Sequence, residues 1–331
     1  GFGYIGTHIA CLLAKHNHEF IIYDNFSNCK INIIQRLNNL TNKRIKFICG
    51  DIRDAENISN VIKDNSISSV IHLASLKSVE ESVIDPLEYY DVNVNGTISL
   101  LKAMQSANVK NLLFSSSATI YGSTSSDKIS EDHIINPTNP YGKTKAAVEN
   151  LLTDLYESDN KWSIASLRYF NPVGAHSSGL IGEDPLGVPN NLFPYISQVA
   201  SGKIKRLKVF GSNWPTTDGT GVRDYVHVSD LAEGHIIALK YLLNNKDANI
   251  LKLNLGSGKG HSVLEVINTY SNVIGRDIPY DIVDRRIGDN AISVADPSLA
   301  NETLGWKTQK SLFEMCKDSW NWQKNNPKGY Y

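Results

Sequence analysis

Five short apolar runs recur in the first half of the chain, and each is separated from the next by a stretch with helical periodicity. The runs span residues 20–23, 45–49, 70–74, 111–116 and 163–169. Such alternation of strands and helices is typical of a parallel sheet that carries helices on both faces. The sequence therefore predicts a doubly wound α/β fold, in which ligands bind at the carboxyl ends of the strands.

The chain begins with a glycine-rich hexapeptide, and a helical pattern follows it. Gly1, Gly3 and Gly6 lie in this hexapeptide, and Asp24 follows the strand-like run at 20–23. A glycine-rich turn lets backbone N–H groups approach a pyrophosphate at the N-terminus of the next helix. An acid about 20 residues further on binds the adenosine ribose hydroxyl, which favours NAD over NADP. The pattern predicts a Rossmann-type NAD-binding domain.

The character of the sequence changes near residue 170, where Pro- and Gly-rich segments with short elements begin. We therefore expect a Rossmann domain over residues 1–170 and a smaller C-terminal α/β substrate domain over residues 171–331. Some segments of the second domain are expected to return to the first. The strand that should deliver the glycine-rich loop is missing, so we expect an apolar segment of roughly five residues upstream of Gly1 in the native protein.

Charge and composition narrow the classes of partner. The formal net charge is -1, and acidic and basic residues are interspersed. The sequence therefore shows no basic segment that would attract nucleic acid or an anionic membrane. No apolar run approaches the roughly 18 residues of a transmembrane helix. The four cysteines are scattered, as is typical of a reducing compartment, and the nine histidines show no metal-ligand spacing. We expect a cytoplasmic protein without a metal site.

A second glycine-rich stretch, residues 256–260, is open to two interpretations. It could form another phosphate-binding loop. However, Ser262 and Glu265 follow it with the spacing of a capping box before an apolar helix. The sequence favours a turn that leads into a capped helix.

A tyrosine and a lysine four residues apart carry the strongest chemical signal. Asn139 can cap a helix whose first position is Pro140, so that Tyr141 and Lys145 share one face. For a phenolate base, the pKa of tyrosine has to fall from about 10 to near 7, a change worth about 4 kcal/mol. A nearby ammonium and a cationic nicotinamide both act in that direction. Ser117, which follows a strand-like run, could bridge the phenol and a substrate hydroxyl.

The glycine-rich start, the strand-end serine and the Tyr-x-x-x-Lys motif together favour a catalytic site over an ordinary exposed pair. In combination they resemble the extended short-chain dehydrogenase/reductase family and, within it, the enzymes that epimerise UDP-hexoses at C4. The resemblance covers essentially all 331 residues. Its distinctive stretches are residues 87–91, 114–119, 167–174, 218–225 and 286–289.

The resemblance implies the reversible, NAD-dependent conversion of UDP-galactose to UDP-glucose in galactose metabolism. In that reaction the phenolate of Tyr141 takes the proton of the sugar 4-hydroxyl, with Ser117 in the proton path, while hydride passes from C4 to NAD. The 4-keto sugar turns over about its pyrophosphate and receives the hydride on its other face. Lys145 would hold the nicotinamide ribose and tune Tyr141. A homodimer packed through helices that include residues 141–156 is also implied.

The resemblance further implies a set of cofactor contacts at the strand ends. Asn25 and Asn93 could instead be turn or cap residues, whereas Asp51 follows a strand, where the adenine edge is read. We interpret Arg168 as a structural ion-pair residue rather than a ligand. The residues implied to bind NAD are Gly1, Gly3, Tyr4, Ile5, Gly6, Asp24, Asn25, Asp51, Ile52, Leu73, Ala74, Lys77, Asn93, Tyr141, Lys145 and Tyr169.

A nucleotide clamp is implied as well, because the hexose has to swing while its UDP stays bound. Arg223 and Arg286 would bind phosphate, and Asp289 would bind the uridine ribose. Ser293 stands where the family carries either a bulky aromatic or a small residue. Since a small residue leaves room for an N-acetyl group, we hypothesise that UDP-GlcNAc and UDP-GalNAc are also interconverted. The residues implied to bind substrate are Ser117, Tyr141, Phe170, Asn171, Asn191, Leu192, Arg223, Arg286, Asp289 and Ser293.

Two other functions stay open on the sequence. A nucleotide-sugar 4,6-dehydratase of the same fold places carboxylates directly after the strand-end hydroxyl residue to eliminate water, whereas Ala118 and Thr119 follow Ser117 here. A non-catalytic NAD-sensing regulator has no need of a tyrosine base, yet Tyr141 and Lys145 are both present. The sequence favours the epimerase.

Overall fold

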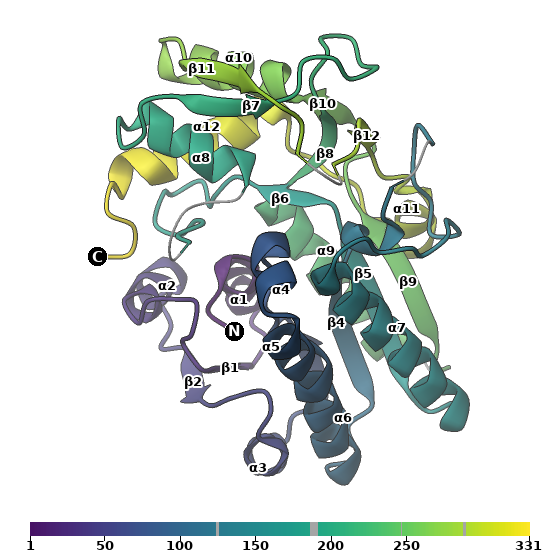
Figure 1. Cartoon of the computed structure of the whole chain (residues 1–331). Coiled ribbons are helices and arrows are strands. Elements are labelled where there is room, and N and C mark those ends of the chain that lie inside the picture. The colour runs from purple at the N-terminus through teal and green to yellow at the C-terminus, as the bar shows by residue number, and fades with distance from the viewer. Residues whose placement is uncertain (124–125, 186–190, 246, 287–288) are drawn as a thin grey trace.

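The computed structural model describes residues 1–123, 126–185, 191–245, 247–286 and 289–331. Figure 1 shows a first part, formed by the N-terminal half, below a second part formed mainly by later residues. The first part contains α1 (Tyr4–Lys15), β1 (Ile21–Asp24), α2 (Ile33–Thr41), β2 (Lys46–Cys49), α3 (Ala55–Asp64), β3 (Ser69–His72), α4 (Val79–Ile84), α5 (Pro86–Tyr90), the π-helix η1 (Asp91–Asn95), α6 (Gly96–Ser106), β4 (Asn111–Ser117), the 3-10 helix η2 (Ala118–Tyr121), α7 (Pro140–Ser158) and β5 (Ser163–Tyr169).

Parallel strands form the centre of the first part. Four of them follow the order β3-β4-β5-β9, and β1 pairs with β2 in a separate parallel pair. All five apolar runs form strands, with bounds that differ from the expected ones by at most two residues. β5 is buried along its whole length, as a strand covered on both faces should be. The predicted doubly wound α/β fold is confirmed.

The second part consists of short strands and helices. Its main sheet has the order β10-β8-β12, with β6 also paired to β8, and β11 pairs with β7. The elements are β6 (Asn171–Val173), α8 (Leu192–Ala200), β7 (Leu207–Phe210), β8 (Val222–His227), α9 (Val228–Asn244), β9 (Ile250–Leu255), β10 (Gly260–Ser262), α10 (Val263–Ile274), β11 (Tyr280–Val283), β12 (Ile292–Ser293), α11 (Ser298–Leu304) and α12 (Leu312–Asn325). Of these, β9 pairs with β5 and α9 packs against α1. The domain boundary near residue 170 stays a prediction.

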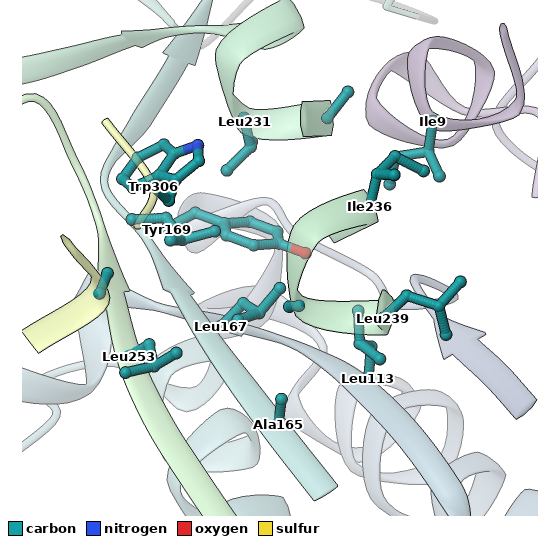
Figure 2. Close-up of a cluster of buried hydrophobic side chains, with 14 of the residues drawn as sticks. Ile9, Leu113, Ala165, Leu167, Tyr169, Leu231, Ile236, Leu239, Leu253 and Trp306 are labelled. Carbon is teal, nitrogen blue, oxygen red and sulfur yellow. The ribbon is translucent and has the colours of Figure 1, made fainter. Parts of the chain in front are cut away.

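A large hydrophobic cluster fixes α1 and α9 against the parallel sheet (Figure 2). Leu113 and Leu167 contribute from the sheet, Ile9 from α1, Ile236 from α9 and Trp306 from the segment after α11, and each is at most 2% exposed. Burying a side chain of this kind contributes about 1.5–3 kcal/mol. The cluster therefore holds the start of α1, and with it the glycine-rich loop, at the edge of the sheet.

The beginnings of α7 and α10 show how local sequence sets the helix ends. The Asn139 side chain accepts a hydrogen bond from Gly142 N at 2.8 Å at the start of α7, as predicted. At α10, Ser262 Oγ accepts from Glu265 N at 3.0 Å, so residues 256–260 do lead into a capped helix. Glu265 turns to His261 Nδ1 instead of completing the box, so only half of the expected capping box forms.

Candidate active site

The first turns of α7 bring a tyrosine and a lysine to the end of β4. Lys145 is 3% exposed, and its Nζ donates to Ser115 O at 2.7 Å. The same ammonium lies 5.9 Å from the ring centroid of the half-buried Tyr141 and 4.9 Å from that of Phe114. The structure therefore places both side chains on the inward face of the helix, next to the strand that ends at Ser117.

Ser117 joins the tyrosine to the strand end. Its side chain shares a hydrogen bond with that of Tyr141. Thr119 donates to Ser117 Oγ from its backbone N at 3.3 Å and from its Oγ1 at 3.0 Å. Because the serine hydroxyl lies beside the phenol, the two groups can exchange a proton directly.

Desolvation dominates the charge states of this pair. It raises the pKa of Tyr141, and the hydrogen bond with Ser117 lowers that pKa in part. Desolvation also lowers the pKa of Lys145 to about 7, against an upward effect of the Glu149 carboxylate. In the chain alone, the pKa of Tyr141 is therefore raised rather than lowered, because removal from water is the larger effect.

The glycine-rich loop is open where a phosphate would bind. Gly3 occupies the N-cap of α1 and supplies no side-chain acceptor for the first helical amides. A Cβ at Gly3 would meet no atom of the described chain within 4 Å, whereas one at Gly1 would overlap Asp24 and one at Gly6 would overlap the Gly1 carbonyl. Open space beside a helix N-terminus suits a pyrophosphate, so these residues fit a dinucleotide.

Acidic side chains stand at the ends of β1 and β2. The Asp24 carboxylate accepts hydrogen bonds from Phe2 N and Phe26 N, both at 2.7 Å. Asn25 Nδ2 donates to Asp51 Oδ2 at 3.1 Å, which brings these two predicted cofactor residues together. Five more of the predicted cofactor-binding residues lie in the first turn of α1 or shortly after β2 and β3. They are Tyr4, Ile5, Ile52, Leu73 and Ala74.

Asn93 fixes the loop that follows β3. It lies in the π-helix η1, an irregularity that often marks functional sites, and is 3% exposed. Its side chain accepts from Leu76 N at 2.8 Å and donates to Leu76 O at 3.1 Å. The neighbouring Lys77 pairs with Glu183 at 3.2 Å, across to the segment after β6. Asn93 is therefore neither a turn nor a cap residue but a tether for the loop that presents Lys77.

Tyr169 has a different environment from the other predicted cofactor residues. Its hydroxyl donates to His235 Nε2, because His235 Nδ1 donates its proton to Leu231 O at 2.8 Å. Figure 2 shows the phenol inside the hydrophobic cluster. The hydroxyl is therefore committed to the core, and the contact of Tyr169 with a cofactor stays a prediction.

The residues after β5 extend the site toward the second part of the molecule. Phe170 is buried in a small cluster beside η2. Asn171 Nδ2 donates to Asp224 O at 2.8 Å, which fastens its side chain to β8. Asn191 and Leu192 are the N-cap and first residue of α8, and Asn191 is exposed.

The predicted phosphate and ribose ligands gather around β8. Arg223 pairs with Asp289, and both side chains are partly exposed. Ser293 is the register partner of Arg223 in β12. The guanidinium of the exposed Arg286 lies 4.0 Å from the ring centroid of Phe210. Cationic groups that can bind phosphate are therefore available at this end of the site.

A buried carboxylate one turn beyond Lys145 escaped the sequence analysis. Glu149 is 0% exposed and accepts from Ser116 Oγ at 2.5 Å and from Arg168 Nη2 at 2.7 Å. The interpretation of Arg168 as an ion-pair residue is confirmed. The sequence did contain a signal for this carboxylate, because Glu149 follows Lys145 by four residues and so lies on the same face of the helix.

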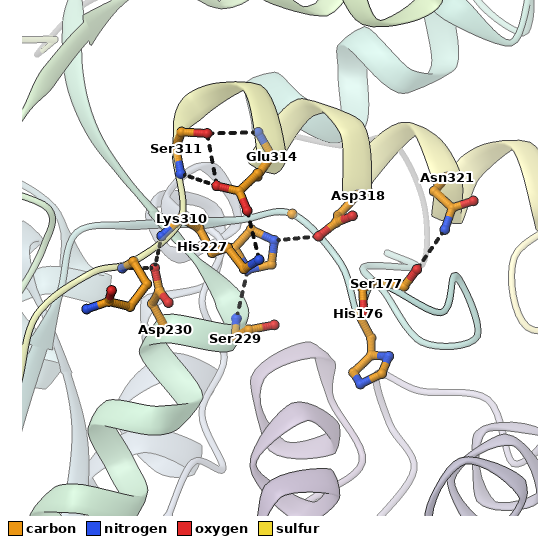
Figure 3. A network of polar contacts seen from close by, with 12 residues as sticks. His176, Ser177, His227, Ser229, Asp230, Lys310, Ser311, Glu314, Asp318 and Asn321 are labelled. Carbon is orange, nitrogen blue, oxygen red and sulfur yellow. Dashed lines mark hydrogen bonds and ion pairs between the residues drawn. The ribbon is translucent and has the colours of Figure 1, made fainter.

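A second polar network joins the start of α9 to α12 and to the segment just before it (Figure 3). His227 Nε2 lies 3.3 Å from Asp318 Oδ2, and His227 Nδ1 accepts from Ser229 N at 3.0 Å. Asp230 accepts from the backbone N of Lys310 at 2.9 Å. These contacts hold the C-terminal helix in place rather than forming part of the site around Tyr141.

In the part of the chain that the structure describes, no helix is long and apolar enough to cross a membrane. Within the same residues, no group of three or more His, Cys, Asp or Glu side chains could hold a metal ion.

The chain is similar over its whole length to proteins of known activity. A family model described as GDP-mannose 4,6 dehydratase matches residues 1–319. The UDP-glucose 4-epimerase of Bacillus subtilis is 50% identical over 330 residues, which cover 100% of this chain and 97% of that protein.

Solved structures agree with this relationship. The UDP-glucose-4-epimerase of Stenotrophomonas maltophila, with bound NAD and formylated UDP-arabinopyranose, gives a TM-score of 0.97 at 46% identity and covers 99% of this chain and 97% of that one. The UDP-glucose 4-epimerase of Bifidobacterium longum, in complex with NAD+ and UDP, gives 0.94 at 45% identity, with 99% and 98% covered.

The description of the family model names the rival dehydratase, whereas the full-length relative and both solved structures are epimerases. Ala118 and Thr119 at the strand end also lack the carboxylates that elimination requires. The chain therefore belongs to the UDP-glucose 4-epimerase family, within the extended short-chain dehydrogenases/reductases.

Proposed function

We propose that this protein interconverts UDP-galactose and UDP-glucose at C4, with NAD as a bound cofactor, in galactose metabolism. The observation that carries the proposal is the contact of Tyr141 with Ser117 above the buried Lys145, at the same sheet edge as the open glycine-rich loop. An oxidation at a sugar hydroxyl needs a proton acceptor next to a hydride acceptor, and this edge offers a place for both.

The side chains of the site would move one proton and hold one ammonium. Tyr141 takes the proton of the 4-hydroxyl at its phenolic oxygen and later returns it to the 4-oxygen, with Ser117 in contact to relay it. Bound NAD would supply the acceptor and donor of hydride for C4 of the sugar and the positive charge that phenolate formation needs. Lys145, held by Ser115 O, would offer a donor to the nicotinamide ribose.

The nucleotide would be held at the other end of the site. Arg223 and Arg286 bind the pyrophosphate, and Asp289 binds the uridine ribose while the hexose turns over. Arg223 pairs with Asp289, and its side chain is 20% exposed. A phosphate could therefore reach the guanidinium and bind it in place of the Asp289 carboxylate or together with it.

A 4,6-dehydratase is the second candidate, and the description of the matching family model favours it. That reaction adds elimination of water between C5 and C6, which requires an acid and a base beside these atoms. Ser117 is followed by Ala118 and Thr119, which cannot supply a carboxylate. The epimerase therefore explains the strand end better.

Ser293 supports a wider substrate range. It is a small residue on β12, directly paired with the strand position of Arg223. We infer that the pocket accepts an N-acetyl group, so that UDP-GlcNAc and UDP-GalNAc are interconverted as well. Assays of both sugars with the wild-type protein and a Ser293→Tyr variant test this. Turnover of UDP-galactose without turnover of either acetylated sugar in the wild type would reject it.

We also propose a cytoplasmic homodimer. Large apolar side chains are exposed on α4 and α5, with Val83 at 65%, Ile84 at 83% and Leu87 at 81%. These helices pack against α7 in the monomer, so a second copy docking there would continue an interface built on residues 141–156. Sedimentation of the protein would show a dimer, and a monomer at micromolar concentration would contradict the proposal.

The test of the function is product analysis without added cofactor. The full protein is purified, its bound nucleotide is identified by mass spectrometry, and UDP-galactose is followed by NMR. We expect retained NAD and an equilibrium of UDP-galactose with UDP-glucose. An accumulating 4-keto-6-deoxy sugar would favour the dehydratase, and bound NAD without any turnover would favour a sensor.

A further inference from the structure

One face of α7 carries three polar side chains at four-residue steps, Tyr141, Lys145 and Glu149. Lys145 is 3% exposed and Glu149 is 0% exposed, although isolated charges are costly to bury. The helix contacts both β4 and β5. The charged face of α7 is therefore turned toward the strand that ends at Ser117.

The last three residues of β4 are each held by this face. Ser115 O accepts from Lys145 Nζ at 2.7 Å, and Ser116 Oγ donates to Glu149 Oε1 at 2.5 Å. The third residue, Ser117, shares a hydrogen bond with the phenol described above. Glu149 thus provides the middle of three consecutive attachments between the helix and the strand end.

Arg168 balances the charge of Glu149. It is the register partner of Ser116 in β5, so the two side chains share one face of the sheet. Its Nε and Nη2 donate to both carboxylate oxygens of Glu149, at 3.0 and 2.7 Å. Its Nη1 donates to Tyr121 OH at 2.8 Å. Such bidentate geometry fixes the carboxylate in one position.

We propose that Glu149 is a positioning residue for the reaction, whose carboxylate shares the inward face of α7 with Lys145 and holds the Ser115–Ser117 strand end against this helix, with Arg168 as its counter-ion. This inference rests on the function proposed above. Neither Glu149 nor Arg168 needs to touch substrate or cofactor, since both act through Lys145 and the serines.

The groups that face Lys145 come from three elements. Tyr141 and Glu149 flank it on α7, His72 faces it from β3, and Arg168 lies behind Glu149 on β5. Burial keeps His72 neutral by lowering its pKa to about 3. Glu149 is therefore the one carboxylate of this set, and it opposes the lowering of the pKa of Lys145 by burial.

A Glu149→Gln variant tests the proposal, because the amide keeps an acceptor for Ser116 but removes the charge. The high-pH limb of the kcat profile, where Lys145 loses its proton, is expected to move to lower pH by about one pH unit or more. Asp230→Asn is the matched control, since Asp230 is a buried carboxylate that accepts backbone hydrogen bonds from Gln309 and Lys310. It is expected to lower stability without moving the profile.

A double variant, Glu149→Leu with Arg168→Leu, separates positioning from stability. Replacing a buried ion pair by apolar side chains avoids the uncompensated charge that a single substitution leaves. The proposal predicts that the folded double variant has a lowered kcat, because the strand end loses its attachment to α7. Its high-pH limb is expected to move less than that of Glu149→Gln, because a positive charge is removed together with the negative one.

Two results would overturn the proposal. One is a pH profile of Glu149→Gln that superimposes on that of the wild type. The other is failure of both variants to fold, which would assign the pair to stability alone. A wild-type protein that does not epimerise UDP-galactose would instead contradict the proposed function, so the two failures are distinguishable.

Discussion

The two ends of the proposed site are built differently. Tyr141, Lys145 and Ser117 stand where a 19-residue helix meets a seven-residue central strand, and Lys145 is buried there. Arg223 and Asp289 stand on a short strand and a loop, with side chains 20% and 32% exposed. The comparison teaches that the groups proposed to transfer a proton are held by regular elements, whereas the groups proposed to hold the nucleotide stay accessible to solvent.

This difference in burial decides how strongly each charged side chain affects its neighbours. Coulombic effects grow as water is excluded, so a single carboxylate such as Glu149 can matter for the protonation of Lys145. Partly exposed pairs such as Arg223–Asp289 contribute little on their own, typically about 0–1 kcal/mol. Such a pair can open for a phosphate at small cost, which suits a clamp for a substrate that has to turn over.

The largest effect is expected at the fixed end. Tyr141→Phe removes the proton acceptor but keeps the ring, so kcat should fall by about 1,000-fold, within the usual range for a lost general base. Retained NAD, measured by mass spectrometry, serves as the control for folding. An undiminished kcat in a protein that still carries NAD would contradict the assignment.

A smaller effect of another kind is expected at the exposed end. Arg223→Leu removes a charge-assisted contact to phosphate and should raise KM for UDP-galactose by about 10- to 100-fold, with little change in kcat. Arg206→Leu is the matched control, because Arg206, just before β7, forms an exposed pair with Asp281 on β11. Two results would contradict a role of Arg223 in binding the nucleotide. One is an equal rise of KM in both variants, and the other is a fall of kcat alone in Arg223→Leu.

The smallest effect concerns stability and pH. Because burial lowers the pKa of Lys145 from 10.5 to about 7, the unfolded chain binds more protons than the folded one between these values. The contribution of Lys145 to stability therefore rises with pH across this window. Urea unfolding should show the wild type gaining stability relative to Lys145→Met between pH 7 and about pH 9. A constant difference would show that Lys145 stays charged when folded.

The sequence predicted the elements of the fold better than their contacts. Apolar runs and the Asn139 cap located the strands and α7, because both signals are local. The pairing of Ser116 with Arg168 depends on the register between β4 and β5, which no local pattern specifies. The sequence also contained no sign of the contact between the Tyr169 hydroxyl and His235, which lies 66 residues further along the chain in α9.

The central claim is that one hydride leaves C4 of the sugar and returns to the same carbon, beside the phenol of Tyr141. UDP-galactose carrying deuterium at C4 tests it most directly, in ordinary water and without added NAD. The account predicts UDP-glucose with deuterium fully retained at C4, measured by NMR and mass spectrometry. Deuterium lost to water, or found at C6, would contradict it.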